Sequence, residues 1–101
     1  MEKPTLLIVE DDADISNMLK MFFERDYDVE TAMGGREALD KTRSLMPSLI
    51  ILDIMLPDIN GYEVCRDLRT HPRTSYIPII FLTQKDDLLS LIHISEPTRP
   101  Y

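Results

Sequence analysis

Several kinds of residue are scarce in this chain of 101 residues, and each shortage excludes some classes of protein. Cys65 is the only cysteine, so no internal disulfide can form and a reducing cytoplasm is the expected compartment. Only 11 lysines and arginines oppose 18 acids, and the net charge of -7 argues against binding nucleic acid or membrane through this domain. No apolar run approaches the roughly 20 residues that span a bilayer, so we expect a soluble protein.

Two short apolar runs carry acids at their carboxyl ends. Residues 6–9 are followed by Glu10, Asp11 and Asp12, and residues 49–52 are followed by Asp53. Unbroken aliphatic runs of this length are typical of strands buried on both faces of a parallel sheet. Because ligands bind beyond the carboxyl ends of such strands, we expect the four carboxylates to converge on one hard-cation site.

The rest of the chain alternates between strand and helix patterns. We predict strands over residues 6–9, 27–32, 49–53 and 77–82, and helices over 14–25, between Gly35 and Pro47, and over 62–69. Asp12 or Asp14 is the expected cap of the first helix. This alternation implies right-handed crossovers and a parallel sheet. The length suits one domain, although it is short for a doubly wound sheet with five helices.

Three motifs, in this order along the chain, resemble the receiver domain of two-component response regulators. They are IVEDD at 8–12, LDIMLPDING at 52–61 and PIIFLT at 78–83. The resemblance covers about residues 4–88. It implies a flavodoxin-like, three-layer α/β/α fold with a parallel sheet of order 2-1-3-4-5, of which the fifth strand and the fifth helix are missing here.

The resemblance also implies a role for each acid. Asp53 matches the aspartate that accepts a phosphoryl group from a histidine kinase or phosphotransfer protein. Asp11 and Asp53 match direct ligands of Mg²⁺, the backbone carbonyl of Met55 matches a third, and Glu10 matches a ligand acting through water. Thr83 matches the switch hydroxyl that bonds the phosphoryl group. The implied function is a phosphorylation-controlled signalling switch in a phosphorelay, and not an enzyme; without metal, the clustered acids should raise at least one pKa.

Two other functions stay open at this point. A Mg²⁺-dependent phosphohydrolase can also form an aspartyl phosphate, but it would normally have a second acid two residues after its nucleophile, where this chain has Met55. A degenerate receiver would act only as an interaction module, a role for which intact acids are not needed.

The chain departs from the family after the third motif. The family's phosphate-pairing lysine and aromatic switch residue cannot be assigned, because Lys85 lies too soon after the fourth strand. Gln84 replaces a small residue, and its longer side chain could slow the entry of phosphodonor or water. Without a fifth strand, one edge of the strand at 77–82 would be unpaired, so we expect the chain as written to aggregate.

The carboxyl-terminal residues do not continue the strand and helix pattern. Residues 89–99 resemble the translation of a transposon-end sequencing adapter. We therefore interpret residues 1–88 as an incomplete receiver domain and residues 89–101 as a non-native tail, which leaves the output domain and the cognate kinase unidentified. The alternative is an unusual native carboxyl terminus.

Overall fold

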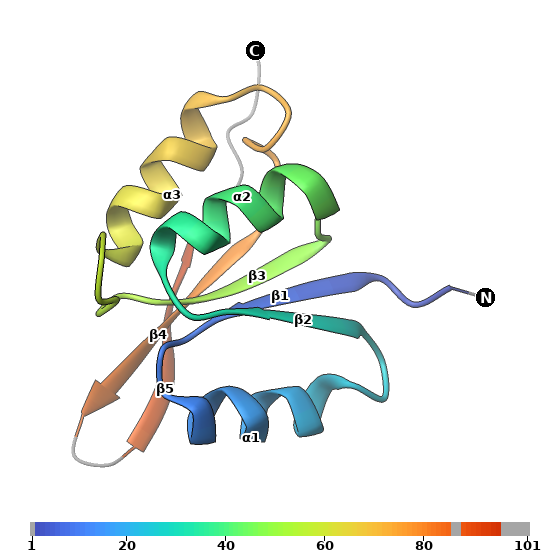
Figure 1. Ribbon diagram of the computed structural model, residues 1–101, viewed down its shortest axis with the longest axis vertical. Coiled ribbons are helices and arrows are strands. Elements are labelled where there is room, and N and C mark those ends of the chain that lie inside the picture. Colours follow the sequence, from blue (N-terminus) through green and yellow to red (C-terminus); the bar gives the residue numbers. More distant parts are fainter. Residues whose placement is uncertain (1, 86–87, 96–101) are drawn as a thin grey trace.

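One five-stranded sheet, with helices on both faces, organises the molecule (Figure 1). The computed structural model describes residues 2–85 and 88–95, and its side chains as far as residue 82. The elements are β1 (Thr5–Val9), α1 (Ala13–Phe23), β2 (Asp28–Ala32), α2 (Gly35–Leu45), β3 (Leu49–Asp53), α3 (Gly61–Thr70), β4 (Ile79–Lys85) and β5 (Leu88–Ser95). Within these ranges, no helix is both long and apolar enough to cross a membrane.

The predicted parallel arrangement of four strands is confirmed, because β2, β1, β3 and β4 lie side by side in that order. The helix α1 covers one face of the sheet, and α2 and α3 cover the other (Figure 1). In β1, Leu6 and Ile8 belong to the core beneath α1, whereas Leu7 and Val9 belong to the core beneath α2 and α3. Both faces of the strand are therefore buried, which explains its unbroken aliphatic run.

Helix α1 begins directly after the acids that end β1. Asp12 is its cap, because its side chain accepts hydrogen bonds from the backbone N–H groups of Asp14 at 2.9 Å and Ile15 at 3.2 Å. The prediction that Asp12 or Asp14 caps this helix is therefore settled in favour of Asp12. Capping of this kind satisfies N–H groups that have no partner within the helix.

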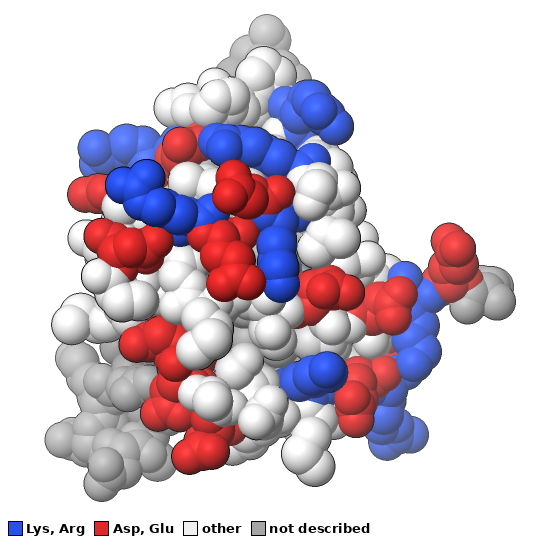
Figure 2. All heavy atoms as spheres, viewed as in Figure 1, with Lys and Arg blue, Asp and Glu red and all other residues white. Residues whose placement is uncertain are grey.

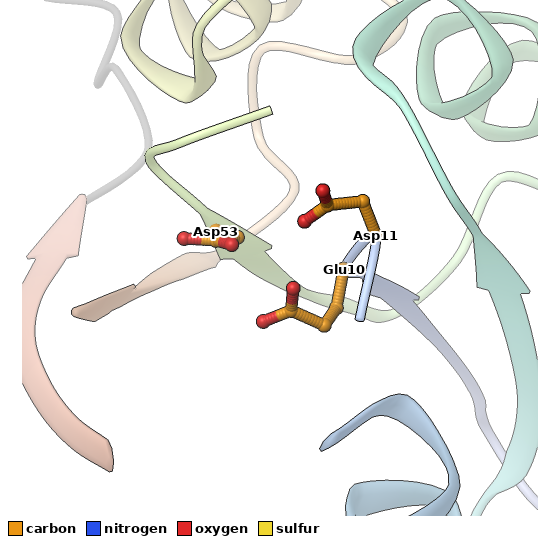
Figure 3. Close-up of side chains that lie close together, drawn as sticks. All are labelled: Glu10, Asp11 and Asp53. Atoms are coloured by element: carbon orange, nitrogen blue, oxygen red, sulfur yellow. The ribbon is translucent and has the colours of Figure 1, made fainter. Parts of the chain in front are cut away.

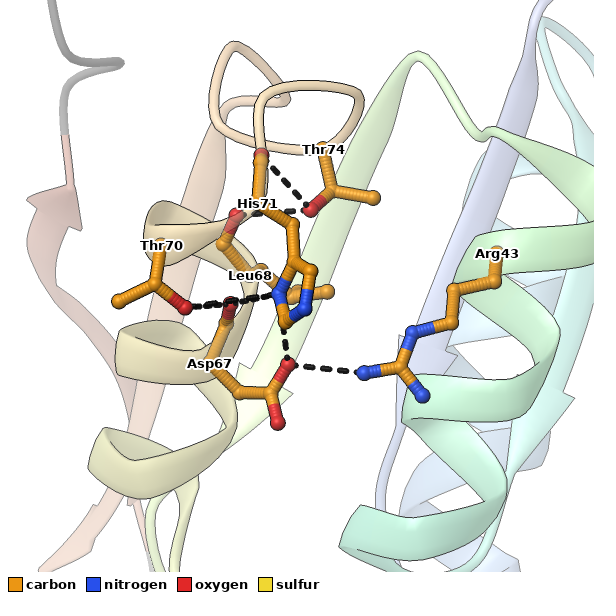
Figure 4. A network of polar contacts seen from close by, with 6 residues as sticks. All are labelled: Arg43, Asp67, Leu68, Thr70, His71 and Thr74. Carbon is orange, nitrogen blue, oxygen red and sulfur yellow. Dashed lines mark hydrogen bonds and ion pairs between the residues drawn. The ribbon is translucent and has the colours of Figure 1, made fainter.

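Polar contacts join α2 and α3 near their carboxyl-terminal ends (Figure 4). Arg43 on α2 forms an ion pair with Asp67 on α3, with 2.9 Å between nitrogen and oxygen. The ring of His71 lies against the same carboxylate at 3.3 Å, and the Thr74 hydroxyl donates to the Leu68 carbonyl at 2.7 Å. The Arg43–Asp67 pair links the two helices, and the other two contacts lie within α3 and the residues that follow it, at a distance from the acids at the strand ends.

The fourth strand differs from its prediction at both ends. It begins at Ile79 and not at Ile77, because Pro78 has no N–H to donate to the ladder, although its carbonyl accepts from Ile50 at 3.0 Å. It continues past Thr83 to Lys85 because β5 pairs with it.

The expectation that one edge of β4 is unpaired is wrong. The strand β5 runs antiparallel to β4, in a register that begins with Lys85 opposite Leu88 and ends with Ile79 opposite Ser95. Aggregation was predicted because this edge of β4 would be unpaired, and that reason does not hold. A parallel fifth strand, and any helix after α3, are missing from the described part of the chain.

Candidate functional site

Glu10 and Asp53 leave the sheet side by side, because Val9 of β1 pairs with Leu52 of β3. Both are buried, with relative exposures of 1% and 4%, whereas the neighbouring Asp11 is exposed. One carboxylate oxygen from each of these three residues lies within 4.8 Å of the other two (Figure 3). The three acids therefore meet at the carboxyl end of the sheet.

Asp12 does not join this group, which corrects the expectation that four carboxylates would converge. Its side chain is turned to the backbone of α1 as the helix cap. Its own N–H still contributes to the site, because it donates to Oε2 of Glu10 at 3.0 Å. The run of three acids thus divides into two that face the site and one that starts a helix.

Burial, and to a smaller extent the charge of a neighbouring acid, shifts the pKa values of the two buried acids. Burial, together with the charge of Asp53, raises the pKa of Glu10 from 4.5 to about 8, although the hydrogen bond from the Asp12 N–H opposes this shift. Burial also raises the pKa of Asp53, against the hydrogen bond that its Oδ1 accepts from the Met55 N–H at 3.2 Å. The raised pKa values agree with the predicted elevation of at least one pKa in the metal-free site, although burial, and not repulsion between the acids, is the largest cause.

The donor set of this site suits a hard cation. Among the described residues, Oε1 of Glu10 is buried without a hydrogen-bond partner. None of the ion pairs in this part of the chain involves the three acids. Buried carboxylates without a cation are costly, and a divalent ion would neutralise them. An all-oxygen set with one or two direct carboxylates, completed by waters and phosphate oxygens, is the kind that Mg²⁺ binds.

Gly61 holds the loop that follows Asp53 close to the site. This β3–α3 loop (residues 54–60) is closed by a hydrogen bond from the Gly61 N–H to the Ile54 carbonyl at 2.8 Å. A Cβ on Gly61 would lie only 2.3 Å from the backbone oxygen of Asp53, so no other residue fits without displacing the strand end. The spacing of Asp53 and Gly61 was part of the family resemblance, but the sequence did not indicate this close approach.

Asp58 is a second residue that sequence reasoning missed. Its two carboxylate oxygens accept hydrogen bonds from the N–H groups of Gly35 at 2.7 Å and Arg36 at 2.9 Å, at the start of α2. These hydrogen bonds lower the pKa of Asp58 to about 2. Its partners lie more than 20 positions away in sequence, and no local spacing indicates such a contact.

The switch hydroxyl predicted at Thr83 can be placed only by its backbone. Asp53 pairs with Leu82 across β3 and β4, so the backbone of Thr83 lies one position beyond the phosphoacceptor candidate. The side chain of Thr83 lies outside the described part, so its role stays a prediction. The same holds for the carbonyl of Met55 as a ligand: the structure places its residue beside Asp53 through the 3.2 Å hydrogen bond and shows no metal contact.

The surface around the site is acidic. On the face shown in Figure 2, acidic side chains without neighbouring lysine or arginine gather at the lower left, over the amino-terminal end of α1. Acidic and basic side chains alternate over α2 and α3. Such a surface attracts cations to the exposed rim of the site, where Asp11 lies.

Comparisons with known proteins show the family. Residues 6–96 match the response regulator receiver domain, and the chain belongs to this family. It is 42% identical over 90 residues to the transcriptional regulatory protein AfsQ1 of Streptomyces coelicolor, a match covering 88% of this chain and 39% of that protein. It is 45% identical over 83 residues to the alkaline phosphatase synthesis transcriptional regulatory protein PhoP of Bacillus subtilis, covering 81% of this chain and 34% of that protein. The chain thus spans less than half the length of these relatives.

Solved structures confirm the receiver fold. The chemotaxis response regulator CheY4 of Vibrio cholerae aligns with a TM-score of 0.77 and 32% sequence identity, over 83% of this chain and 71% of that one. The N-terminal domain of a response regulator receiver protein from Methanoculleus marisnigri aligns with a TM-score of 0.77 and 35% identity, over 81% of this chain and 68% of that one. The flavodoxin-like fold expected from the three motifs is therefore confirmed.

Proposed function

We propose that this receiver domain accepts a phosphoryl group on Asp53 from a phosphohistidine of a histidine kinase or phosphotransfer protein. The observation that carries this proposal is the buried carboxylate of Asp53 at the end of β3, with Glu10 and Asp11 beside it. The domain then acts as a substrate and a switch, and not as an enzyme in the usual sense.

In the proposed step, one carboxylate oxygen of Asp53 attacks phosphorus, and the bond from phosphorus to the histidine nitrogen breaks. The bonding electrons return to the imidazole, which takes up a proton, and Asp53 becomes an acyl phosphate. The N–H of Met55 orients the carboxylate through its hydrogen bond to Oδ1. Burial of Asp53 keeps bulk water away from the reacting group.

A Mg²⁺ ion at this site would neutralise the charge on the phosphoryl oxygens during transfer. Asp11 and Asp53 would hold it directly, the backbone carbonyl of Met55 would be the third protein ligand, and Glu10 would act through a water. The unpartnered Oε1 of Glu10 supports this assignment, because it leaves an acceptor available for such a water.

The output of the switch would pass through Thr83 and the surface around it. We propose that the Thr83 hydroxyl donates to the phosphoryl group and draws the following residues toward Asp53, since a phosphoryl group adds charge and acceptor oxygens that order nearby backbone. Two relatives are named transcriptional regulatory proteins and are more than twice as long as the matched region. The domain would thus control a transcriptional output in the cytoplasm, carried by another part of a longer regulator.

The phosphohydrolase alternative has no observation in its favour, because the exposed side chain of Met55 occupies the position of its second acid. Acetyl phosphate labelling of the full chain with Mg²⁺ tests the phosphoacceptor. We expect the label on the parent protein and on Asp40→Asn, which removes an exposed acid of α2, and its loss in Asp53→Asn. Equal labelling of Asp53→Asn and the parent would remove Asp53 from this role.

A further inference from the structure

The loop that follows the phosphoacceptor is attached to a neighbouring helix by one side chain. Asp58 lies in the β3–α3 loop, and its carboxylate accepts from the N–H groups of Gly35 and Arg36 at 2.7 and 2.9 Å. The N-cap residue of α2, Gly34, makes no side-chain cap hydrogen bond. Most helices are capped by the side chain of their own N-cap residue, whereas α2 is capped by Asp58 from the β3–α3 loop.

The two glycines at the start of α2 make room for this contact. A Cβ on Gly34 would lie 3.0 Å from Oδ1 of Asp58, and a Cβ on Gly35 would lie 2.3 Å from Cγ1 of Ile59. Ile59 packs against the core under α2 and α3, so the loop is held by an apolar contact next to the polar one. The carboxylate also lies at the positive end of the α2 dipole, which favours its charged form.

The attached loop is the one that shapes the phosphorylation site. Its far end is fixed by the Gly61 N–H, which donates to the Ile54 carbonyl at 2.8 Å. Met55 lies between that closure and Asp58, and its N–H donates to Oδ1 of Asp53. Only Leu56 and Pro57 separate Met55 from Asp58, and the ring of Pro57 fixes one backbone angle of this short segment, so we expect a shift of Asp58 to be passed to the backbone at Met55.

We propose that Asp58 is a positioning residue for the phosphorylation site: by attaching the β3–α3 loop to α2, it sets the place of the Met55 backbone, and with it the affinity for Mg²⁺ and the rate at which Asp53 is phosphorylated. The inference rests on the proposed function, because the role of Met55 as a ligand comes from there. Asp58 is not among the acids that meet at the site, and its carboxylate is bonded to the start of α2. Its effect passes through the loop backbone.

The test compares three variants of the full chain. Asp58→Ala removes both acceptors, Asp58→Asn keeps one carbonyl oxygen, and Asp40→Ala is the matched control, an exposed acid on α2 itself. Titration calorimetry with Mg²⁺ alone gives the dissociation constant, and acetyl phosphate gives the labelling rate. Residues that orient metal ligands from outside typically change affinity by about 10-fold or more, so we expect about a 10-fold weaker Mg²⁺ affinity and slower labelling in Asp58→Ala.

We expect Asp58→Asn to fall between Asp58→Ala and the parent, and Asp40→Ala to match the parent. A residue that only capped α2 would lower the melting temperature and leave the Mg²⁺ affinity of the folded protein unchanged, and that result would overturn the inference. If Asp58→Ala does not fold, an affinity of Asp58→Asn equal to that of the parent overturns it instead. The Mg²⁺ titration contains no phosphodonor, so failure of Asp53 to be labelled would overturn the proposed function and leave this result standing.

Discussion

Glu10 and Asp53 come directly after Val9 and Leu52, which pair across the parallel strands β1 and β3, and their buried carboxylates lie in one site. Two negative charges this close, largely removed from water, cannot both form without a compensating cation. We therefore expect one of them to bind a proton in the metal-free protein at neutral pH, in agreement with the raised pKa of Glu10. The geometry that suits a metal is thus unfavourable to the folded protein when the metal is absent.

This relationship predicts how the stability of the metal-free protein depends on pH. Folded Glu10 has a pKa of about 8 against 4.5 for the free side chain, so between these values the folded state holds a proton that the unfolded state has lost. Stability is therefore highest below about pH 4.5 for this group, and falls as the pH rises toward 8. The raised pKa of Asp53 acts in the same direction.

The variant Glu10→Gln isolates this effect, because it keeps the shape and removes the ionisation. In the presence of a chelator at pH 8, we expect it to be more stable than the parent by at least roughly 2 kcal/mol, a difference that shrinks to less than about 1 kcal/mol at pH 5 and vanishes only below the unfolded pKa of 4.5. Urea unfolding at both pH values measures it. Adding Mg²⁺ at pH 8 should stabilise the parent more than the variant. A constant difference between the two proteins across this pH range would contradict the assignment.

The close approach of Gly61 to Asp53 predicts the effect of a single methyl group. In Gly61→Ala the new Cβ would lie 2.3 Å from a backbone oxygen of Asp53, and a backbone group cannot turn aside as a side chain can. We expect a loss of at least about 2 kcal/mol in the free energy of unfolding, together with weaker Mg²⁺ binding, because the strand end must shift.

Gly34→Ala is the matched control for that change. Its Cβ would meet an oxygen of the Asp58 side chain at 3.0 Å, and its φ of -155° suits any residue. We expect a smaller loss of stability than in Gly61→Ala, measured by the same denaturant titration. A loss in Gly61→Ala of less than about 1 kcal/mol, no larger than that in Gly34→Ala, would show that the Gly61 contact can relax, against the expected displacement of Asp53.

The sequence predicts best where local pattern and burial act in the same direction. The bounds of β3, residues 49–53, agree with the prediction, because its aliphatic residues are buried on both faces and a polar acid ends the run. The meeting of Glu10, Asp11 and Asp53 follows from the parallel pairing of their strands. These short-range patterns were therefore sufficient to predict that Glu10, Asp11 and Asp53 lie together.

Features that depend on contacts between distant segments could not be predicted in this way. An acid after a strand can face a metal site or cap the next helix, and only the geometry of α1 assigns Asp12 to the cap. The contact of Asp58 with α2 joins segments 22 and 23 residues apart. The pairing of β5 with β4 was missed because its residues were attributed to a non-native tail, an interpretation that remains a prediction.

Thr42 predicts a stabilising substitution away from the site. Its side chain on α2 is fully buried, and within the described part of the chain its hydroxyl has no hydrogen-bond partner. A buried hydroxyl without a partner costs about 1 kcal/mol or more, and valine has the same shape without the hydroxyl. We therefore expect Thr42→Val to raise the free energy of unfolding by about 1 kcal/mol, seen as a higher melting temperature.

Thr42→Ser is the control, because it keeps the hydroxyl and removes the methyl group that packs in the core, and it should be less stable than the parent. If Thr42→Val is instead the less stable of the two variants, the hydroxyl has a partner in solution, and the core under α2 is more polar than its packing indicates.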